Sequence, residues 1–130
     1  MNDRQRCVEI LAAEDATILA LKGEIDICTA TEFKEALLGS IAGGSRPIVV
    51  DAAKATFMDS SGLSVLIAGE QRLRALGGSL AVVASHNVER LLKVAGLRDF
   101  LALYPSRDEA LRAASGAPSS GVAALAADAL

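Results

Sequence analysis

The residues best suited to chemistry lie in one short stretch, FMDSSGLSVLI, which runs from Phe57 to Ile67. This stretch places Asp59 directly before two hydroxyls, Ser60 and Ser61, at the expected start of a helix. Such side chains can cap a helix, because their oxygens accept hydrogen bonds from its first backbone N–H groups. A serine hydroxyl can also act as a nucleophile or accept a phosphate. Three roles are therefore open to the motif: helix cap, nucleophile or phosphate acceptor.

Nucleophilic catalysis finds little support in the rest of the sequence. A nucleophilic serine needs an adjacent base, and the G-x-S-x-G elbow typical of α/β-hydrolases is absent. The only imidazole is His86, which stands at the start of a different expected helix. We expect His86 to be a solvated or capping residue, no residue to be catalytic, and the protein not to be an enzyme.

Phosphate acceptance fits the motif better. A helix N-terminus offers free N–H groups and the positive end of the helix dipole, so a phosphate on Ser60 would be tolerated there. It would add roughly −1.5 to −2 charge beside Asp59 and would repel a partner docked on the unmodified loop. The sequence has no Walker A motif and no G-x-G-x-x-G loop, so we expect a separate kinase to supply the phosphate.

Composition excludes several other classes of function. With 130 residues, 52% of them hydrophobic, the chain can form one domain with a core. Aromatic residues make up 3% and the net charge is −3, which argues against binding to nucleic acid and to anionic membranes. Cys7 and Cys28 have no metal-binding spacing, so we expect reduced thiols and no metal or other cofactor. No targeting segment or membrane span is apparent, which makes the cytoplasm the expected location.

The N-terminal part of the chain predicts two strands and a helix. Short apolar segments at residues 6–14 and 16–23 are typical of an antiparallel pair joined by a tight turn. The tetrapeptide GEID, residues 23–26, follows the second strand. Thr29 and Glu32 then have the spacing of a capping box at the start of a helix.

From residue 46 onward, apolar strands alternate with amphipathic helices. Strands are expected at residues 46–51, 79–84 and 101–105, and helices from near 62 to 76, at 85–97 and at 106–114. Such alternation favours parallel strands, and the N-terminal pair makes the sheet mixed. We therefore predict an α/β fold with a sheet of four or five strands and about four helices. Residues 1–114 form the predicted domain, and residues 115–130, rich in Ala, Ser and Gly, a predicted flexible tail.

Sites in open sheets of this kind lie at the carboxyl ends of the strands. Two loops qualify here: GEID after the second strand, and FMDSSG between the third strand and the following helix. These two loops are therefore the candidates for the functional site.

Three segments together resemble a known family. LKGEIDICTATEFKEAL, PIVVDAAKATFMDSSGLSVLI and ASHNVERLLKVAGL are similar to the STAS domain, and more narrowly to bacterial anti-sigma factor antagonists, also called anti-anti-sigma factors. The resemblance runs from about residue 7 to residue 113. It implies a small mixed sheet with helices packed around it.

The resemblance also implies a mechanism. In that family the unphosphorylated antagonist binds an anti-sigma factor that is also a serine kinase, which frees the sigma factor. The kinase then phosphorylates the first serine after the motif aspartate, which here is Ser60. The modified antagonist dissociates, and a PP2C-type phosphatase resets it. Ser61 would be the acceptor if the register of the loop differs.

The partner-contacting residues implied by the resemblance extend over both loops. They are Glu24, Asp26, Asp59, Ser60, Ser61 and Gly62. An alternative function within the same family is a STAS scaffold or an accessory subunit of a stress-signalling or lipid-transport complex.

Overall fold

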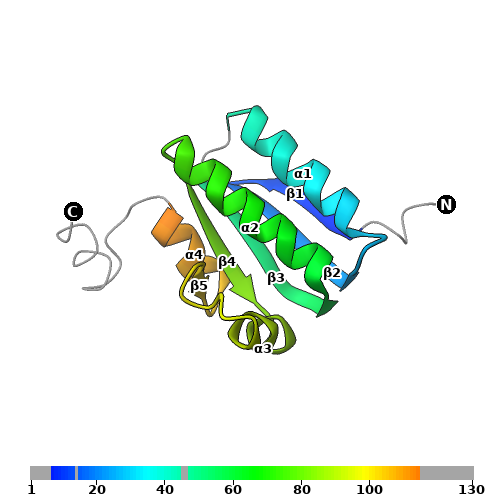
Figure 1. Ribbon diagram of the computed structural model, residues 1–130. Coiled ribbons are helices and arrows are strands. Elements are labelled where there is room, and N and C mark those ends of the chain that lie inside the picture. Colours follow the sequence, from blue (N-terminus) through cyan, green and yellow to red (C-terminus); the bar gives the residue numbers. More distant parts are fainter. Residues whose placement is uncertain (1–6, 14, 45–46, 115–130) are drawn as a thin grey trace.

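Five strands form a single sheet with the order β1-β2-β3-β4-β5, and four helices pack around it (Figure 1). This computed structural model describes residues 7–13, 15–44 and 47–114, and the counts refer to them. The predicted α/β fold with a small mixed sheet is confirmed, whereas the predicted tail, residues 115–130, lies outside the described residues. The elements are β1 (Val8–Ala12), β2 (Thr17–Ile25), α1 (Ala30–Ala42), β3 (Pro47–Met58), α2 (Ser60–Ala75), β4 (Ser79–Ala84), α3 (His86–Val94), β5 (Ala102–Tyr104) and α4 (Arg107–Ala114).

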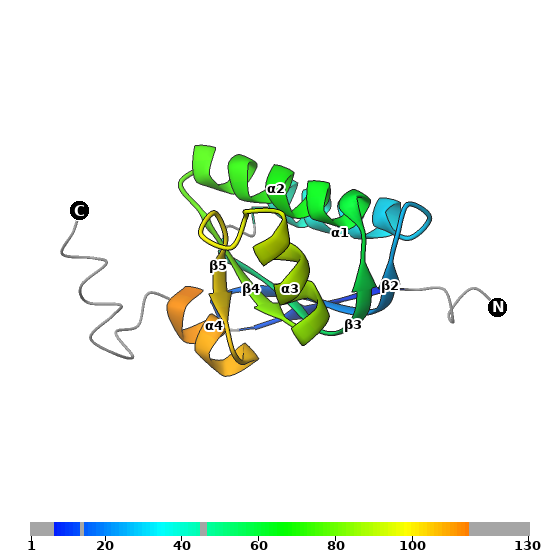
Figure 2. The same ribbon diagram turned by 60° about the horizontal axis from the view of Figure 1, so that its bottom comes forward.

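The sheet is mixed because β1 and β2 are antiparallel while β2, β3, β4 and β5 are parallel to one another. Figure 2 shows α1 and α2 above the sheet and α4 below it. Two separate apolar clusters match these layers. The larger one includes side chains of α1, α2 and α3, and the smaller one is formed by strand residues together with α4.

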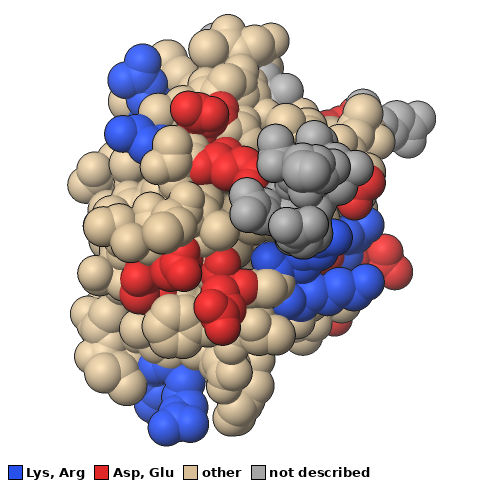
Figure 3. Space-filling model, turned by 90° about the vertical axis from the view of Figure 1, so that its right-hand side faces the viewer, with Lys and Arg blue, Asp and Glu red and all other residues tan. Residues whose placement is uncertain are grey.

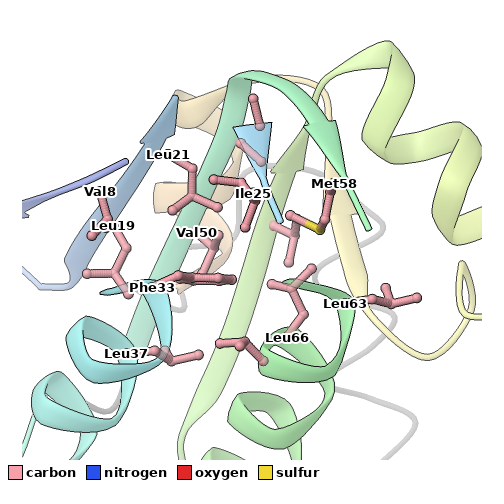
Figure 4. Packing of buried hydrophobic residues seen from close by; sticks show 14 of the residues in the cluster. Val8, Leu19, Leu21, Ile25, Phe33, Leu37, Val50, Met58, Leu63 and Leu66 are labelled. Carbon is pink, nitrogen blue, oxygen red and sulfur yellow. The ribbon is translucent and has the colours of Figure 1, made fainter. Parts of the chain in front are cut away.

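The larger cluster fixes the position of α1 and α2. Phe33 and Leu37 of α1 and Leu66 of α2 are completely buried, as are Leu19 and Val50 of the sheet (Figure 4). The helical residues follow the three-to-four-residue spacing that places side chains on one face of a helix. The long, apolar side of each helix is thereby held against the strands whose ends carry the two loops.

Strand β3 is longer than predicted. The apolar run ends at Asp51, but the strand continues to Met58. The pairing register between β2 and β3 shifts after Ala20, which marks a β-bulge or similar irregularity, and Asp51 Oδ1 accepts a hydrogen bond from the Ala53 N–H at 3.0 Å. A bulge accommodates extra residues in one strand and allows the two strands to pair again beyond it. The pattern of apolar residues along the chain does not show where such a bulge occurs.

The observed helix ends agree in part with those predicted from the sequence. Helix α2 begins at Ser60, earlier than the predicted start near Gly62, because Asp59 caps it. Helix α3 ends at Val94, before the predicted limit of residue 97. Gly96 has φ +75°, and the Leu97 N–H donates to the Leu92 carbonyl at 2.8 Å in a Schellman arrangement.

The predicted capping box between Thr29 and Glu32 is wrong. Thr29 occupies the N-cap position of α1, but its side chain makes no capping hydrogen bond to the helix. The Glu32 carboxylate instead accepts the N–H groups of Cys7 at 3.1 Å and Val8 at 3.4 Å. Glu32 therefore ties the start of β1 to α1, a long-range use of the side chain that outweighs the local motif.

Candidate functional site

The two segments predicted as loops lie side by side at the carboxyl ends of β2 and β3, but residues 23–25 and 57–58 still belong to the strands, which run further than predicted. Glu24 pairs with Phe57, and Ile25 with Met58, in the parallel register of these strands. The Asp59 N–H also donates to the Ile25 carbonyl at 3.1 Å. GEID and FMDSSG are therefore neighbours, and a backbone hydrogen bond joins the two segments.

Asp59 is the residue that caps α2. Its Oδ1 accepts the Ser61 N–H at 2.8 Å, and its carbonyl accepts the Leu63 N–H at 3.1 Å. Of the possible caps, Asp59 thus takes the role and Ser60 does not. The sequence allowed either residue, and the extended backbone of Asp59, with φ −107° and ψ −169°, suits an N-cap.

Ser60 is the first residue of α2 and is exposed. Its carbonyl accepts a hydrogen bond from Ser64 Oγ at 2.9 Å, whereas its own hydroxyl bonds to none of the described residues. Ser61, the next residue, is only partly exposed. Ser60 therefore presents the more accessible hydroxyl at this helix N-terminus.

Gly62 is buried in the first turn of α2, where the helix approaches the strand ends closely. A Cβ atom at this position would lie 2.8 Å from Ile25 Cγ2 and 2.8 Å from Met58 Cγ. Such distances are shorter than a carbon–carbon contact allows. The absence of a side chain at Gly62 lets α2 begin directly over β2 and β3 and so places Ser60 at their ends.

The loop between β2 and α1 is organised by Asp26. Its Oδ1 accepts the N–H groups of Cys28 at 2.9 Å and Thr29 at 3.1 Å. The Thr29 N–H has the largest effect and lowers the pKa of Asp26 below its ordinary value, burial opposes this, and the Cys28 N–H lowers the pKa further. Thr29 Oγ1 closes the turn by donating to the Glu24 carbonyl at 2.7 Å. Asp26 is therefore a shaping residue, while the neighbouring Glu24 is exposed.

Two large apolar side chains flank the serines, and the sequence analysis did not assign them a role. Ile27 is 74% exposed and Phe57 is 49% exposed. Phe57 is the first residue of FMDSSG and Ile27 directly follows GEID, which is the signal that could have identified them. We define the docking surface as Glu24, Ile27, Phe57, Ser60 and Ser61.

A shallow apolar hollow of about 370 Å³ continues this surface between α1 and α2. Ile27 and Ser61 line it at the end near the strand termini. Its other lining residues are Ala30, Thr31, Lys34, Leu38, Ser64, Val65 and Ala68. The combination of exposed apolar side chains and a hollow is typical of a surface that receives another protein.

The same end of the molecule is acidic. Figure 3 shows Asp and Glu side chains across the middle of this end, with Lys and Arg side chains in separate groups at the upper left, the bottom and the right of the view. Glu24, Asp26 and Asp59 contribute carboxylates from the two loops. A new negative charge on Ser60 would therefore join an existing negative field.

The described residues offer no catalytic or metal-binding constellation. They contain no group of three or more His, Cys, Asp or Glu side chains able to hold a metal ion. His86 is exposed at the start of α3, and no hydrogen bond joins it to Ser60 or Ser61. Cys7 and Cys28 are both free thiols.

No helix within the described residues combines the length and the hydropathy needed to cross a bilayer.

Comparisons with known proteins agree on one family. The STAS domain profile matches residues 8–110. The anti-sigma-B factor antagonist of Staphylococcus aureus strain NCTC 8325 is 30% identical over 80 residues, which are 61% of this chain and 74% of that protein. The anti-sigma-B factor antagonist of Staphylococcus epidermidis is 26% identical over 95 residues, 72% of this chain and 88% of that protein. A crystal structure of an anti-sigma factor antagonist from Mycobacterium paratuberculosis matches with a TM-score of 0.76 and 29% identity, over 82% of this chain and 92% of that one.

Proposed function

This chain belongs to the STAS domain family, and from that premise we propose that it is an anti-sigma factor antagonist switched by phosphorylation of Ser60. The observation that carries the proposal is that the cap of α2 and the exposed hydroxyl are provided by two different residues of the motif. Asp59 caps α2, which leaves the exposed Ser60 hydroxyl without a structural task. A hydroxyl that the fold does not need is suited to modification.

In the unmodified state the docking surface binds an anti-sigma factor that is also a serine kinase, and this frees a sigma factor. The exposed side chains of Ile27 and Phe57 give the contact its apolar area. Large apolar and aromatic side chains carry much of the energy of such contacts when they become buried. Glu24, Asp26 and Asp59 supply acidic groups around them, and Gly62 keeps α2 close to the strand ends.

Phosphorylation is a group transfer performed by the bound kinase. Ser60 Oγ attacks the γ-phosphorus of the ATP held by the kinase, the Oγ–P bond forms, and the bond to the β,γ-bridging oxygen breaks. ADP leaves, and the hydroxyl proton passes to a base of the kinase. A PP2C-type phosphatase reverses the change by adding water to the phosphorus, which returns the Ser60 hydroxyl and releases inorganic phosphate.

Release follows from charge rather than from refolding. The phosphate adds about −1.5 to −2 charge at neutral pH, next to Asp59 and close to the other acidic side chains. The N-terminus of α2 tolerates this charge because of its dipole, so the domain keeps its shape. The docking surface, in contrast, becomes strongly anionic and its contact with the kinase is lost.

Ser60 is a better acceptor than Ser61 for a geometric reason. Ser61 is partly covered and lines the hollow between α1 and α2, whereas Ser60 is exposed. The hydroxyl that an external kinase can reach most easily is therefore that of Ser60.

The test is a phosphorylation and binding assay with a candidate anti-sigma kinase, ATP and magnesium. We expect phosphate on Ser60 by peptide mass spectrometry, together with loss of kinase binding. Ser60→Ala should bind as tightly as the unmodified chain and stay bound when ATP is present. Ser60→Asp should bind at least about tenfold more weakly, because it places a charge at the contact.

Ser61→Ala is the matched control, because it removes the neighbouring hydroxyl and leaves the cap of Asp59 in place. It should be phosphorylated and released like the unmodified chain. Phosphate on Ser61 would move the acceptor by one residue. Unaltered binding of both Ser60 variants would refute the switch and favour a scaffold or accessory subunit, which binds its partners without phosphorylation.

A further inference from the structure

A second hollow of about 650 Å³ lies beside the start of α4, and none of the residues of the docking surface lines it. Three basic residues line this hollow: Lys22 of β2, Lys54 of β3 and Arg107 of α4. The protein as a whole is acidic, with a net charge of −3. The hollow also has the carboxylates of Glu9 and Asp51 in its lining, so basic groups outnumber acidic ones there although the whole chain is acidic.

The two lysines are direct neighbours across the sheet. Lys22 and Lys54 are register partners on the parallel strands β2 and β3. Like charges in such positions destabilise a sheet, and neither lysine forms a salt bridge with a described residue. An anion bound between the two ammonium groups would remove this repulsion.

Arg107 is held at the same hollow by an ion pair with Asp51. Its Nε donates to Asp51 Oδ2 at 2.8 Å, and the other carboxylate oxygen of Asp51 accepts the Ala53 N–H at the irregularity in β3. Each oxygen of Asp51 thus accepts one hydrogen bond, and this carboxylate makes no salt bridge with either lysine. The contact uses only Nε, and the guanidinium carries two further NH₂ groups that can donate to a ligand.

The lining also limits the kind of anion. Its remaining members are Val8, Glu9, Ala20, Leu21, Asp51 and Ala53, none of which is aromatic. The lining therefore offers no aromatic side chain on which a nucleobase could stack. The volume lies within the range of small-molecule sites and exceeds what a single inorganic phosphate needs. Lysine and arginine together are the usual recognition groups for phosphate.

We propose that this hollow is a binding site for a small phosphorylated metabolite that carries no nucleobase. The ammonium groups of Lys22 and Lys54 bind the phosphate, and the NH₂ groups of Arg107 complete the set of donors. The bulge in β3 brings these groups to one face of the sheet. The proposal does not depend on the phosphorylation of Ser60.

The experiment is a titration of the full chain with inorganic pyrophosphate at constant ionic strength, followed by amide NMR. We expect saturable shifts at the amides around Lys22 and Lys54. Lys22→Gln and Lys54→Gln should each weaken binding by about tenfold, because each removes a charge-assisted hydrogen bond. Lys93→Gln removes an exposed lysine from the last turn of α3 and should leave the affinity unchanged.

Thermal unfolding supplies an independent readout that does not require resonance assignments. Pyrophosphate should raise the midpoint of the unmodified chain and of Lys93→Gln, because a ligand that binds only the folded state stabilises it. The double variant Lys22→Gln with Lys54→Gln should fold and show no such rise. This variant also separates loss of the ligand from loss of the fold.

Several outcomes would overturn the proposal. One is the absence of any saturable shift, and another is an equal affinity in the lysine variants and the unmodified chain. Binding to vesicles that contain phosphatidic acid, without binding to pyrophosphate, would assign the lysines to a membrane contact. Binding to an acidic peptide alone would assign them to a protein contact.

Discussion

At the scale of single residues, the site depends on which polar groups the fold already uses. Asp59 is committed to the first turn of α2, and Asp26 to the turn before α1. Ser60 and Glu24 are exposed and have no such task in their side chains. The same motif therefore contains both a residue that shapes the helix start and the residue proposed to be modified.

The two thiols provide a prediction about reactivity. Cys28 is exposed, whereas Cys7 is buried, and burial, followed by the charge of Glu32, raises the pKa of its thiol from 9.0 to about 11. The reactive form is the thiolate. With a disulfide reagent at about pH 8, we therefore expect Cys28 to react rapidly and Cys7 to react only on unfolding.

Single substitutions test which cysteine gives the rapid phase of the reaction with the disulfide reagent. Cys28→Ser should remove the rapid phase, and Cys7→Ser should leave it intact. Two rapid phases in the folded protein would contradict the burial of Cys7.

The raised pKa of Cys7 also predicts how stability depends on pH. Because it favours the neutral thiol in the folded state, the contribution of Cys7 to stability is present below pH 9.0 and is lost as the pH rises toward 11.

At the scale of elements, the site depends on how closely α2 approaches its neighbours. Gly69 lies where α2 meets α1, and a Cβ atom there would be 2.4 Å from Leu37 Cδ2 and 3.2 Å from Leu37 Cγ. Leu37 is completely buried and cannot move aside without disturbing the core. The spacing of α1 and α2, and with it the shallow hollow between them, therefore rests on a glycine.

We predict that Gly69→Ala lowers the free energy of unfolding by about 1–3 kcal/mol, the usual cost of overpacking a core. Chemical denaturation measures this change. Gly39→Ala is the matched control, because Gly39 lies within α1 and a Cβ atom there would meet nothing within 4 Å. This control should be stabilising by about 0.5–1 kcal/mol, since alanine favours a helix more than glycine does. Equal effects of the two changes would mean that the helices are not closely packed.

At the scale of the whole molecule, the proposed switch and the core occupy different places. The two apolar clusters lie on opposite faces of the sheet, and the loops with Ser60 lie at the ends of its strands. Modification of Ser60 therefore changes the charge at one end of the molecule and leaves the packing intact. The hollow with Lys22 and Lys54 shares no lining residue with the docking surface, although Lys22 also lines a larger hollow together with Glu24.

The domain boundary gives a prediction at this scale. Helix α4 ends at Ala114, and its Ala110 is completely buried in the smaller cluster. We expect a chain of residues 1–114 to unfold at the same temperature as the full chain and to bind the kinase equally well. Calorimetry and a binding assay measure these two properties. A lower unfolding temperature would show that residues 115–130 contribute to the fold, and weaker binding alone would show that they contact the partner.

The sequence by itself determined the order of the elements, the family and the motif with its proposed acceptor serine. These features depend on local signals: apolar periodicity, capping residues and glycines at helix ends, such as Gly96 after α3. Where the signal was local but a distant group competed for the side chain, the prediction failed. Glu32 bonds to the start of β1 instead of completing a capping box with Thr29.

Only the tertiary structure decided which residues become neighbours and which side chains remain exposed. It pairs Glu24 with Phe57, leaves Ile27 exposed, and places Lys22 opposite Lys54. These outcomes follow from strand register, from the irregularity in β3 and from the close packing of helices on the sheet. Register and packing are set by the sum of many contacts between residues far apart in the chain, and no short stretch of sequence contains that sum.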